Sequence, residues 1–200
     1  MVDMRVELAG LELANPVLLA SGILDSTPGI LARMADAGAG ALVTKSISLK
    51  PRPGYAGPTV AEVAPGTWIN AMGLPNPGLA EFLDEFDLRD GKVTVIPNLV
   101  ADTPAEFGEL AAGVAGAGAK LAEINLSCPH PQAAYTGLLT AQDPEAAATA
   151  VAAASEHLPV IAKLSPNVSD IGTIAVACAE AGADTIMAYH PEALEQRLGR

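Results

Sequence analysis

The chain has 200 residues, half of them hydrophobic, which is enough for one soluble domain with a sizeable core. Its formal net charge of −12 argues against nucleic acid as a partner, because binding a phosphate backbone needs clustered lysine and arginine. No apolar run reaches the ~18 residues of a membrane helix, and two cysteines without a C-x-x-C motif argue against a disulfide scaffold or a zinc cluster. We therefore expect a cytoplasmic protein with no membrane partner.

Short apolar runs alternate with Ala-rich amphipathic segments along the chain. Each run is nearly continuous, which is typical of parallel strands covered on both faces. A small β-hairpin within Arg5–Ala14, with its turn at Gly10, precedes them and is predicted to close the bottom of a barrel. The predicted strands are Val17–Ala20, Ala41–Ser46, Val93–Leu99, Leu121–Leu126, Val160–Leu164 and Thr185–Ala188.

Helix starts are marked by a capping residue followed by proline, at Thr27-Pro28, Thr103-Pro104 and Asp143-Pro144. Thr103 and Glu106 also have the spacing of a capping box. A stripe of Ile171, Ile174, Ala175 and Cys178 predicts the core face of a further helix. This strand–helix alternation fits either a barrel or a doubly wound sheet.

The connection Leu49–Gly78 is long and rich in proline and glycine. A loop of this length inside a compact domain is usually functional or disordered. Because it contains Trp68–Met72, we predict an ordered active-site loop, in which Trp68 is a packing residue.

Polar side chains lie at or just after the carboxyl ends of the predicted strands, where the reactive groups of parallel β/α-barrels lie. Lysines, asparagines and a thiol in these places predict one pocket for a polar, partly anionic ligand. The residues are Ser21, Lys45, Ser46, Asn98, Asn125, Cys128 and Lys163.

Five motifs occur in the order and spacing of one known family. They are Asn15–Gly22, Val43–Ser46, Asn70–Gly78, Glu123–Pro129 and Ala162–Asn167. The sequence thereby resembles the dihydroorotate dehydrogenases of class 1, and its Thr-Lys-Ser-Ile and Lys-Leu-Ser-Pro-Asn forms are most similar to class 1B catalytic subunits. It is also related to the pyrimidine-binding domain of dihydropyrimidine dehydrogenase. The resemblance implies an α/β fold, a TIM (β/α)8-type barrel that binds FMN.

The resemblance also assigns roles to residues. FMN would contact Ser21, Lys45, Ser46, Asn98, Asn125 and Lys163. Dihydroorotate would be held by Lys45, Asn70, Ala71, Met72, Gly73, Leu74 and Asn125, and Cys128 would be the catalytic base. Likeness to class 1B implies FAD and a 2Fe-2S cluster on a partner subunit, NAD as the final acceptor, and a homo-oligomer at full length.

Departures from the family pattern keep three functions open. His130 replaces an asparagine of the family, as in dihydropyrimidine dehydrogenases, and His190 stands where another substrate asparagine is usual. The leading hypothesis is oxidation of dihydroorotate to orotate in pyrimidine (UMP) biosynthesis. The alternatives are a reductase of uracil or thymine and a non-catalytic barrel fragment.

The resemblance stops near Met187. We expect residues 1–200 to form a single incomplete barrel domain with about six of the eight βα units of a complete barrel. In this interpretation the chain is truncated at its C-terminus, and residues 190–200 are an atypical tail.

Overall fold

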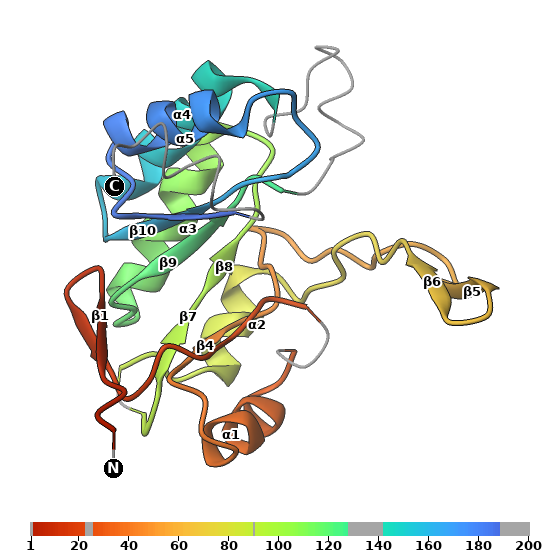
Figure 1. Ribbon diagram of the computed structural model, residues 1–200, viewed down its shortest axis with the longest axis horizontal. Helices are drawn as coiled ribbons and strands as arrows, with labels where there is room; N and C mark the ends of the chain where they lie inside the picture. The colour runs from red at the N-terminus through yellow and green to blue at the C-terminus, as the bar shows by residue number, and fades with distance from the viewer. Residues whose placement is uncertain (1, 23–25, 90, 128–141, 189–200) are drawn as a thin grey trace.

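The computed structural model describes residues 2–22, 26–89, 91–127 and 142–188 (Figure 1). Parallel strands form the sheet, and each neighbour in it is reached by a crossover. The strands are β3 (Leu18–Leu19), β4 (Ala41–Val43), β7 (Thr94–Ile96), β8 (Asn98–Leu99), β9 (Ala122–Asn125), β10 (Val160–Lys163) and β11 (Thr185–Met187). They pair in the orders β3-β4-β7 and β8-β9-β10-β11. All the predicted parallel strands are therefore confirmed.

β7 and β8 are one strand path interrupted at Pro97. Proline has no N–H to donate, but its carbonyl still accepts from the Glu123 N–H at 2.9 Å. The residues after β4 run beside both β7 and β8. The Thr44 N–H donates to the Ile96 carbonyl at 3.0 Å, and the Ile47 N–H donates to the Asn98 carbonyl at 2.8 Å. The strands β3-β4-β7 and β8-β9-β10-β11 are therefore parts of one continuous sheet.

The helices are α1 (Pro28–Asp36), α2 (Leu79–Glu85), α3 (Pro104–Gly116), α4 (Pro144–Ser155) and α5 (Ile171–Glu180). Thr27, Thr103 and Asp143 accept hydrogen bonds from first-turn amides, so all three proline-marked starts are confirmed. The capping box closes differently from the prediction. The carboxylate of Glu106 accepts from the Asp102 N–H at 2.9 Å, one residue before the cap. The short helix α2 was not predicted.

The strands alternate between two apolar clusters. Leu42, Leu99 and Ile124 face outward into a cluster with buried residues of α3, α4 and α5. Val43, Ile96, Leu121 and Ile161 face inward, and Leu13 packs against them. Leu13 ends the hairpin of β1 (Val6–Leu8) and β2 (Leu11–Leu13). The hairpin thus covers the inner face where the strands begin, as predicted for the bottom of a barrel.

The connection between β4 and α2 contains a second hairpin, β5 (Val60–Ala64) paired with β6 (Thr67–Asn70). It projects away from the parallel strands, at the right of Figure 1. Trp68 on β6 is 62% exposed. The prediction of Trp68 as a packing residue is therefore wrong, because no described layer of the protein covers this two-stranded hairpin.

In the part of the chain that the structure describes, no helix has the length and apolar character needed to cross a bilayer.

Gly40, between α1 and β4, permits a close backbone approach. Its N–H donates to the Val17 carbonyl at 2.7 Å, and a Cβ at this position would overlap the Asn15 carbonyl oxygen. We expect Gly40→Ala to lower the free energy of unfolding by about 2 kcal/mol, because backbone must move to relieve the overlap. Urea denaturation measures the loss.

Gly38→Ala is the matched control. Gly38 has a φ of +102° but an added Cβ meets no atom within 4 Å, so only the backbone strain of about 1 kcal/mol applies. A smaller loss for Gly40→Ala than for Gly38→Ala would contradict the argument.

Cys178 on α5 is fully buried beside Ile174 and Ala175, so the predicted core stripe is confirmed. Burial raises the pKa of the Cys178 thiol from 9.0 to about 12. The unfolded thiol ionises above pH 9 while the folded thiol stays protonated, so this group's contribution to stability is constant below pH 9 and decreases from pH 9 to 12.

Wild type should therefore lose about 1.4 kcal/mol more than Cys178→Ala between pH 8 and pH 10. Chemical denaturation of both proteins at each pH measures this difference. Parallel pH profiles for the two proteins would show that the burial of Cys178 has no such effect.

Candidate functional site

Buried polar side chains gather where the parallel strands end. Ser46 follows β4, Asn98 lies near the end of the β7–β8 strand path, and Asn125 ends β9; all three are buried. The Asn125 Nδ2 donates to the Ser46 Oγ at 3.0 Å. Because β8 lies between these two strands, this hydrogen bond reaches across it. The carboxyl ends of β4 and β9 therefore share one polar rim.

A second group of polar residues lies on the inner face of β8, β9 and β10. The Lys163 Nζ lies 3.6 Å from the Glu123 Oε1, and the Asn98 Nδ2 donates to the same oxygen. In the sheet register Lys163 is beside Asn125, and Asn98 is beside Glu123. Residues in register on parallel strands share a face, as do residues two apart on one strand. Asn98, Glu123, Asn125 and Lys163 therefore share the inner face near the strand ends.

Glu123 was missed as a site residue by the sequence analysis. It is 1% exposed, and full burial of a carboxylate is unusual unless it is paired. The available signal was a single charged residue inside the otherwise apolar predicted strand Leu121–Leu126, two positions before Asn125. With period-two alternation, that spacing puts both side chains on one face.

Lys45 joins the first two strand ends. Lys45 follows β4, and its Nζ donates to the carbonyl of Gly22, which follows β3, at 2.7 Å. Ser21, next to Gly22, is half-buried. The structure therefore brings Lys45 beside the segment that holds Ser21.

One acceptor in this group lacks a partner. The Asn98 Oδ1 is buried and has no hydrogen-bond partner among the described residues. Leaving a buried polar atom unpaired costs about 1–3 kcal/mol, and such atoms in native proteins call for an explanation. A ligand N–H would satisfy this acceptor. Together with the Lys163 ammonium, the arrangement suits a ligand that offers both an N–H donor and negative charge.

The predicted substrate segment lies on the projecting hairpin and on the loop after it. Asn70 and Ala71 are exposed, and the Ala71 N–H donates to the Thr59 carbonyl at 2.8 Å. These contacts hold the start of the segment to the hairpin, away from the strand ends (Figure 1). The structure therefore does not bring Asn70 to the rim. Met72, Gly73 and Leu74 are half-buried, and Gly73 and Leu74 have positive φ.

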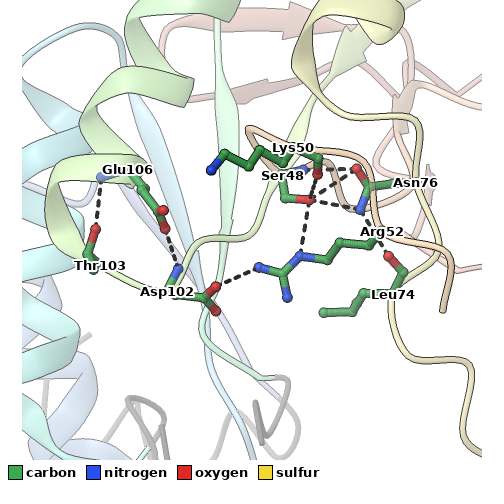
Figure 2. A network of polar contacts seen from close by, with 8 residues as sticks. All are labelled: Ser48, Lys50, Arg52, Leu74, Asn76, Asp102, Thr103 and Glu106. Atoms are coloured by element: carbon green, nitrogen blue, oxygen red, sulfur yellow. Dashed lines mark hydrogen bonds and ion pairs between the residues drawn. The ribbon is translucent and has the colours of Figure 1, made fainter. Parts of the chain in front are cut away.

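Asn76 anchors the end of this segment (Figure 2). Its Oδ1 accepts from the Ser48 N–H at 3.1 Å and the Gly78 N–H at 3.0 Å, and its Nδ2 donates to the Leu74 carbonyl at 2.9 Å. Ser48 also accepts from the Arg52 Nε at 3.2 Å. Figure 2 shows the network continuing from Arg52 to Asp102, before α3, through an ion pair of 3.0 Å.

The predicted catalytic base, Cys128, lies outside the described residues, as do His130, His190 and the predicted tail 190–200. Ser127, the last described residue before Cys128, is bound to the rim. Its Oγ and its N–H donate to the Asn125 Oδ1 at 2.8 Å and 3.1 Å.

Parallel strands with helices on the outer face and polar residues at the carboxyl ends define a protein of the β/α-barrel class. A family model described as dihydroorotate dehydrogenase matches residues 3–190. The chain therefore belongs to the dihydroorotate dehydrogenase family, as its motifs predicted.

Two relatives support the class 1B likeness. The chain is 45% identical over 191 residues to the dihydroorotate dehydrogenase B (NAD(+)) catalytic subunit of Pyrococcus furiosus, covering 94% of this chain and 62% of the relative. It is 44% identical over 184 residues to the protein of the same name from Methanocella arvoryzae, covering 90% and 60%. The chain thus spans about three fifths of the length of these relatives.

A solved structure supports the fold. The crystal structure of DHODH from Eimeria tenella in complex with ferulenol superposes with a TM-score of 0.71, at 20% identity, over 96% of this chain and 62% of that one. The prediction of a TIM-type barrel with part of its βα units is confirmed.

Proposed function

We propose that this chain carries the FMN- and substrate-binding rim of a dihydroorotate dehydrogenase that oxidises dihydroorotate to orotate in pyrimidine biosynthesis. The observation that carries the proposal is the shared rim. Lysine and amide groups from strands far apart in the sequence lie on one inner face, where Glu123 contacts both Lys163 and Asn98. The Asn125 amide also donates to the Ser46 hydroxyl at the end of β4.

The donor set fits FMN. An isoalloxazine ring offers an N–H donor and carbonyl acceptors, which match the unpaired Asn98 Oδ1 and the amide and ammonium donors around it. The proposed FMN contacts are Ser21, Lys45, Ser46, Asn98, Asn125 and Lys163. When bound, FMN supplies the hydride acceptor that no amino-acid side chain provides. The ammonium of Lys163 stabilises negative charge in the pocket, and its burial strengthens this effect.

The roles of the substrate residues follow from their chemistry. Asparagine is both donor and acceptor, so Asn125 can match the amide edge of a pyrimidine. Lys45 suits the carboxylate of dihydroorotate, and the segment Asn70–Leu74 would complete the site by closing over the rim. Cys128 would take the proton from carbon 5, for which it needs the thiolate form.

The partner and the compartment belong to the same proposal. The two relatives are named as NAD(+)-type catalytic subunits. We infer a partner subunit with FAD and a 2Fe-2S cluster, NAD as the final acceptor, a homo-oligomeric catalytic subunit, and a cytoplasmic location.

Reconstitution of the purified chain with FMN tests this function. After removal of free FMN, the chain should stay yellow, and anaerobic dihydroorotate should bleach the flavin absorbance. Cys128→Ser should keep the flavin and slow the bleaching at neutral pH by at least tenfold. Bleaching at an unchanged rate would remove Cys128 from the mechanism.

The rival functions predict different results in the same assay. His130 favours a dihydropyrimidine dehydrogenase-like reductase, for which reduced FMN would be reoxidised by uracil or thymine and dihydroorotate would be inert. A chain that remains colourless at saturating FMN would be a non-catalytic barrel. Either result would contradict dihydroorotate oxidation by this chain.

A further inference from the structure

We propose that Glu123 is a positioning residue, which fixes the orientation of the Asn98 amide and the place of the Lys163 ammonium at the rim. As far as the ligand is FMN, this inference rests on the proposed function. Glu123 itself lies below the strand end, two residues before Asn125 on β9. It therefore acts through Asn98 and Lys163.

The first effect concerns the direction of the Asn98 amide. An asparagine amide can present either its oxygen or its nitrogen to a ligand, and a carboxylate can only accept hydrogen bonds. Because the Asn98 Nδ2 donates to the Glu123 Oε1, the Asn98 Oδ1 is left as the acceptor, and it has no other partner among the described residues. The backbone of Asn98 is also held, since its N–H donates to the Thr44 Oγ1 at 3.1 Å and its carbonyl accepts from Ile47 at 2.8 Å. Glu123 thus decides that the pocket offers an acceptor here.

The second effect concerns Lys163. A lysine side chain is long and flexible, and an ammonium without a partner samples several rotamers. The carboxylate of Glu123 lies 3.6 Å from its Nζ, and the side chain of Lys163 is only 11% exposed. The pair therefore holds the cation on the inner face of β10. It also adds a negative charge that partly offsets the cation felt by a bound ligand.

A simpler interpretation is that Glu123 and Lys163 form a purely structural ion pair between β9 and β10. The structural role and the positioning role predict different results. A structural pair would affect folding stability and leave the ligand's electronic properties unchanged. A positioning residue affects how the pocket binds flavin and at which potential the bound flavin is reduced.

Glu123→Gln is the main test. A glutamine amide can donate to the Asn98 Oδ1, so the Asn98 amide can turn and present its N–H₂ to the ligand. We expect FMN affinity to fall by about tenfold or more, which corresponds to the loss of one hydrogen bond with an unpaired group left behind. The midpoint potential of the remaining bound flavin should rise, because a negative charge beside it has been removed.

Two further variants complete the design. Glu123→Asp keeps the charge and shortens the side chain by one methylene. It should weaken FMN binding and shift the potential less than Glu123→Gln does. It also carries the test if Glu123→Gln does not fold. Glu109→Gln removes a charge from an exposed position on α3, so affinity and potential should equal those of wild type. Equal results for Glu123→Gln and Glu109→Gln would overturn the proposal.

A measurement without flavin separates this proposal from the proposed function. In the NMR spectrum of the flavin-free chain, the side-chain amide of Asn98 is identified by its loss in Asn98→Leu. It should exchange slowly in wild type and at least tenfold faster in Glu123→Gln, since the charge-assisted hydrogen bond is lost. Failure of wild type to bind FMN would contradict the proposed function alone. An Asn98 amide that exchanges equally in both proteins would contradict the role of Glu123.

Discussion

Lys163→Met should lower the free energy of unfolding by about 3 kcal/mol, because it removes a cation from a buried carboxylate. The Glu123 side chain is 1% exposed, and the Lys163 Nζ lies 3.6 Å from it. Methionine fills most of the lysine volume, so little of the loss comes from a cavity. Urea denaturation followed by circular dichroism measures the change.

Two controls define the origin of the Lys163 effect. Lys120→Met removes a lysine that is exposed between α3 and β9, and it should change stability by less than about 0.5 kcal/mol. Adding Glu123→Gln to Lys163→Met removes the buried negative charge that has lost its lysine and should recover at least about 1 kcal/mol. A loss below about 1 kcal/mol for Lys163→Met, or no recovery in the double variant, would show that Lys163 does not stabilise the buried Glu123 carboxylate.

Asn76→Ala should destabilise the chain by about 3 kcal/mol, because one side chain satisfies several buried groups. The Ser48 and Gly78 amides both lose their acceptor, and the Leu74 carbonyl loses its donor (Figure 2). Alanine offers no replacement for any of these bonds. The loss should appear in urea denaturation and as faster proteolysis within residues 50–78, since the network fixes this segment to the barrel.

Asn167→Ala is the matched control, because it truncates an exposed asparagine in the loop before α5. It should cost less than about 0.5 kcal/mol. Unchanged proteolysis of residues 50–78 in Asn76→Ala would contradict the anchoring role, even if the global stability decreased.

The elements that could be predicted from the sequence are those encoded by local patterns. The Thr27-Pro28 and Asp143-Pro144 starts depend on first-turn amides only a few residues away, so their chemistry is visible in a short window. The apolar run at Leu121–Leu126 likewise shows that β9 is covered on both faces. These local signals were enough for the strands and three capped helices, whereas the choice of a barrel over a doubly wound sheet came from the family resemblance.

The remaining contacts depend on three-dimensional register. The partners of Glu123 follow from how β8, β9 and β10 align, and no short window contains that alignment. The Arg52–Asp102 ion pair joins residues fifty apart in sequence. The exposure of Trp68 depends on which layer, if any, covers the β5–β6 hairpin. Motif resemblance placed Asn98, Asn125 and Lys163 near one another, but the buried carboxylate between Asn98 and Lys163 was visible only in the structure.

A crystal structure of this chain soaked or grown with FMN would show where the flavin binds. We expect the isoalloxazine ring on the inner face at the carboxyl ends of β4, β8, β9 and β10, with a ring N–H donating to the Asn98 Oδ1 and the Lys163 ammonium beside the ring. Flavin bound elsewhere on the chain, with the Asn98 acceptor still unpaired, would contradict this placement.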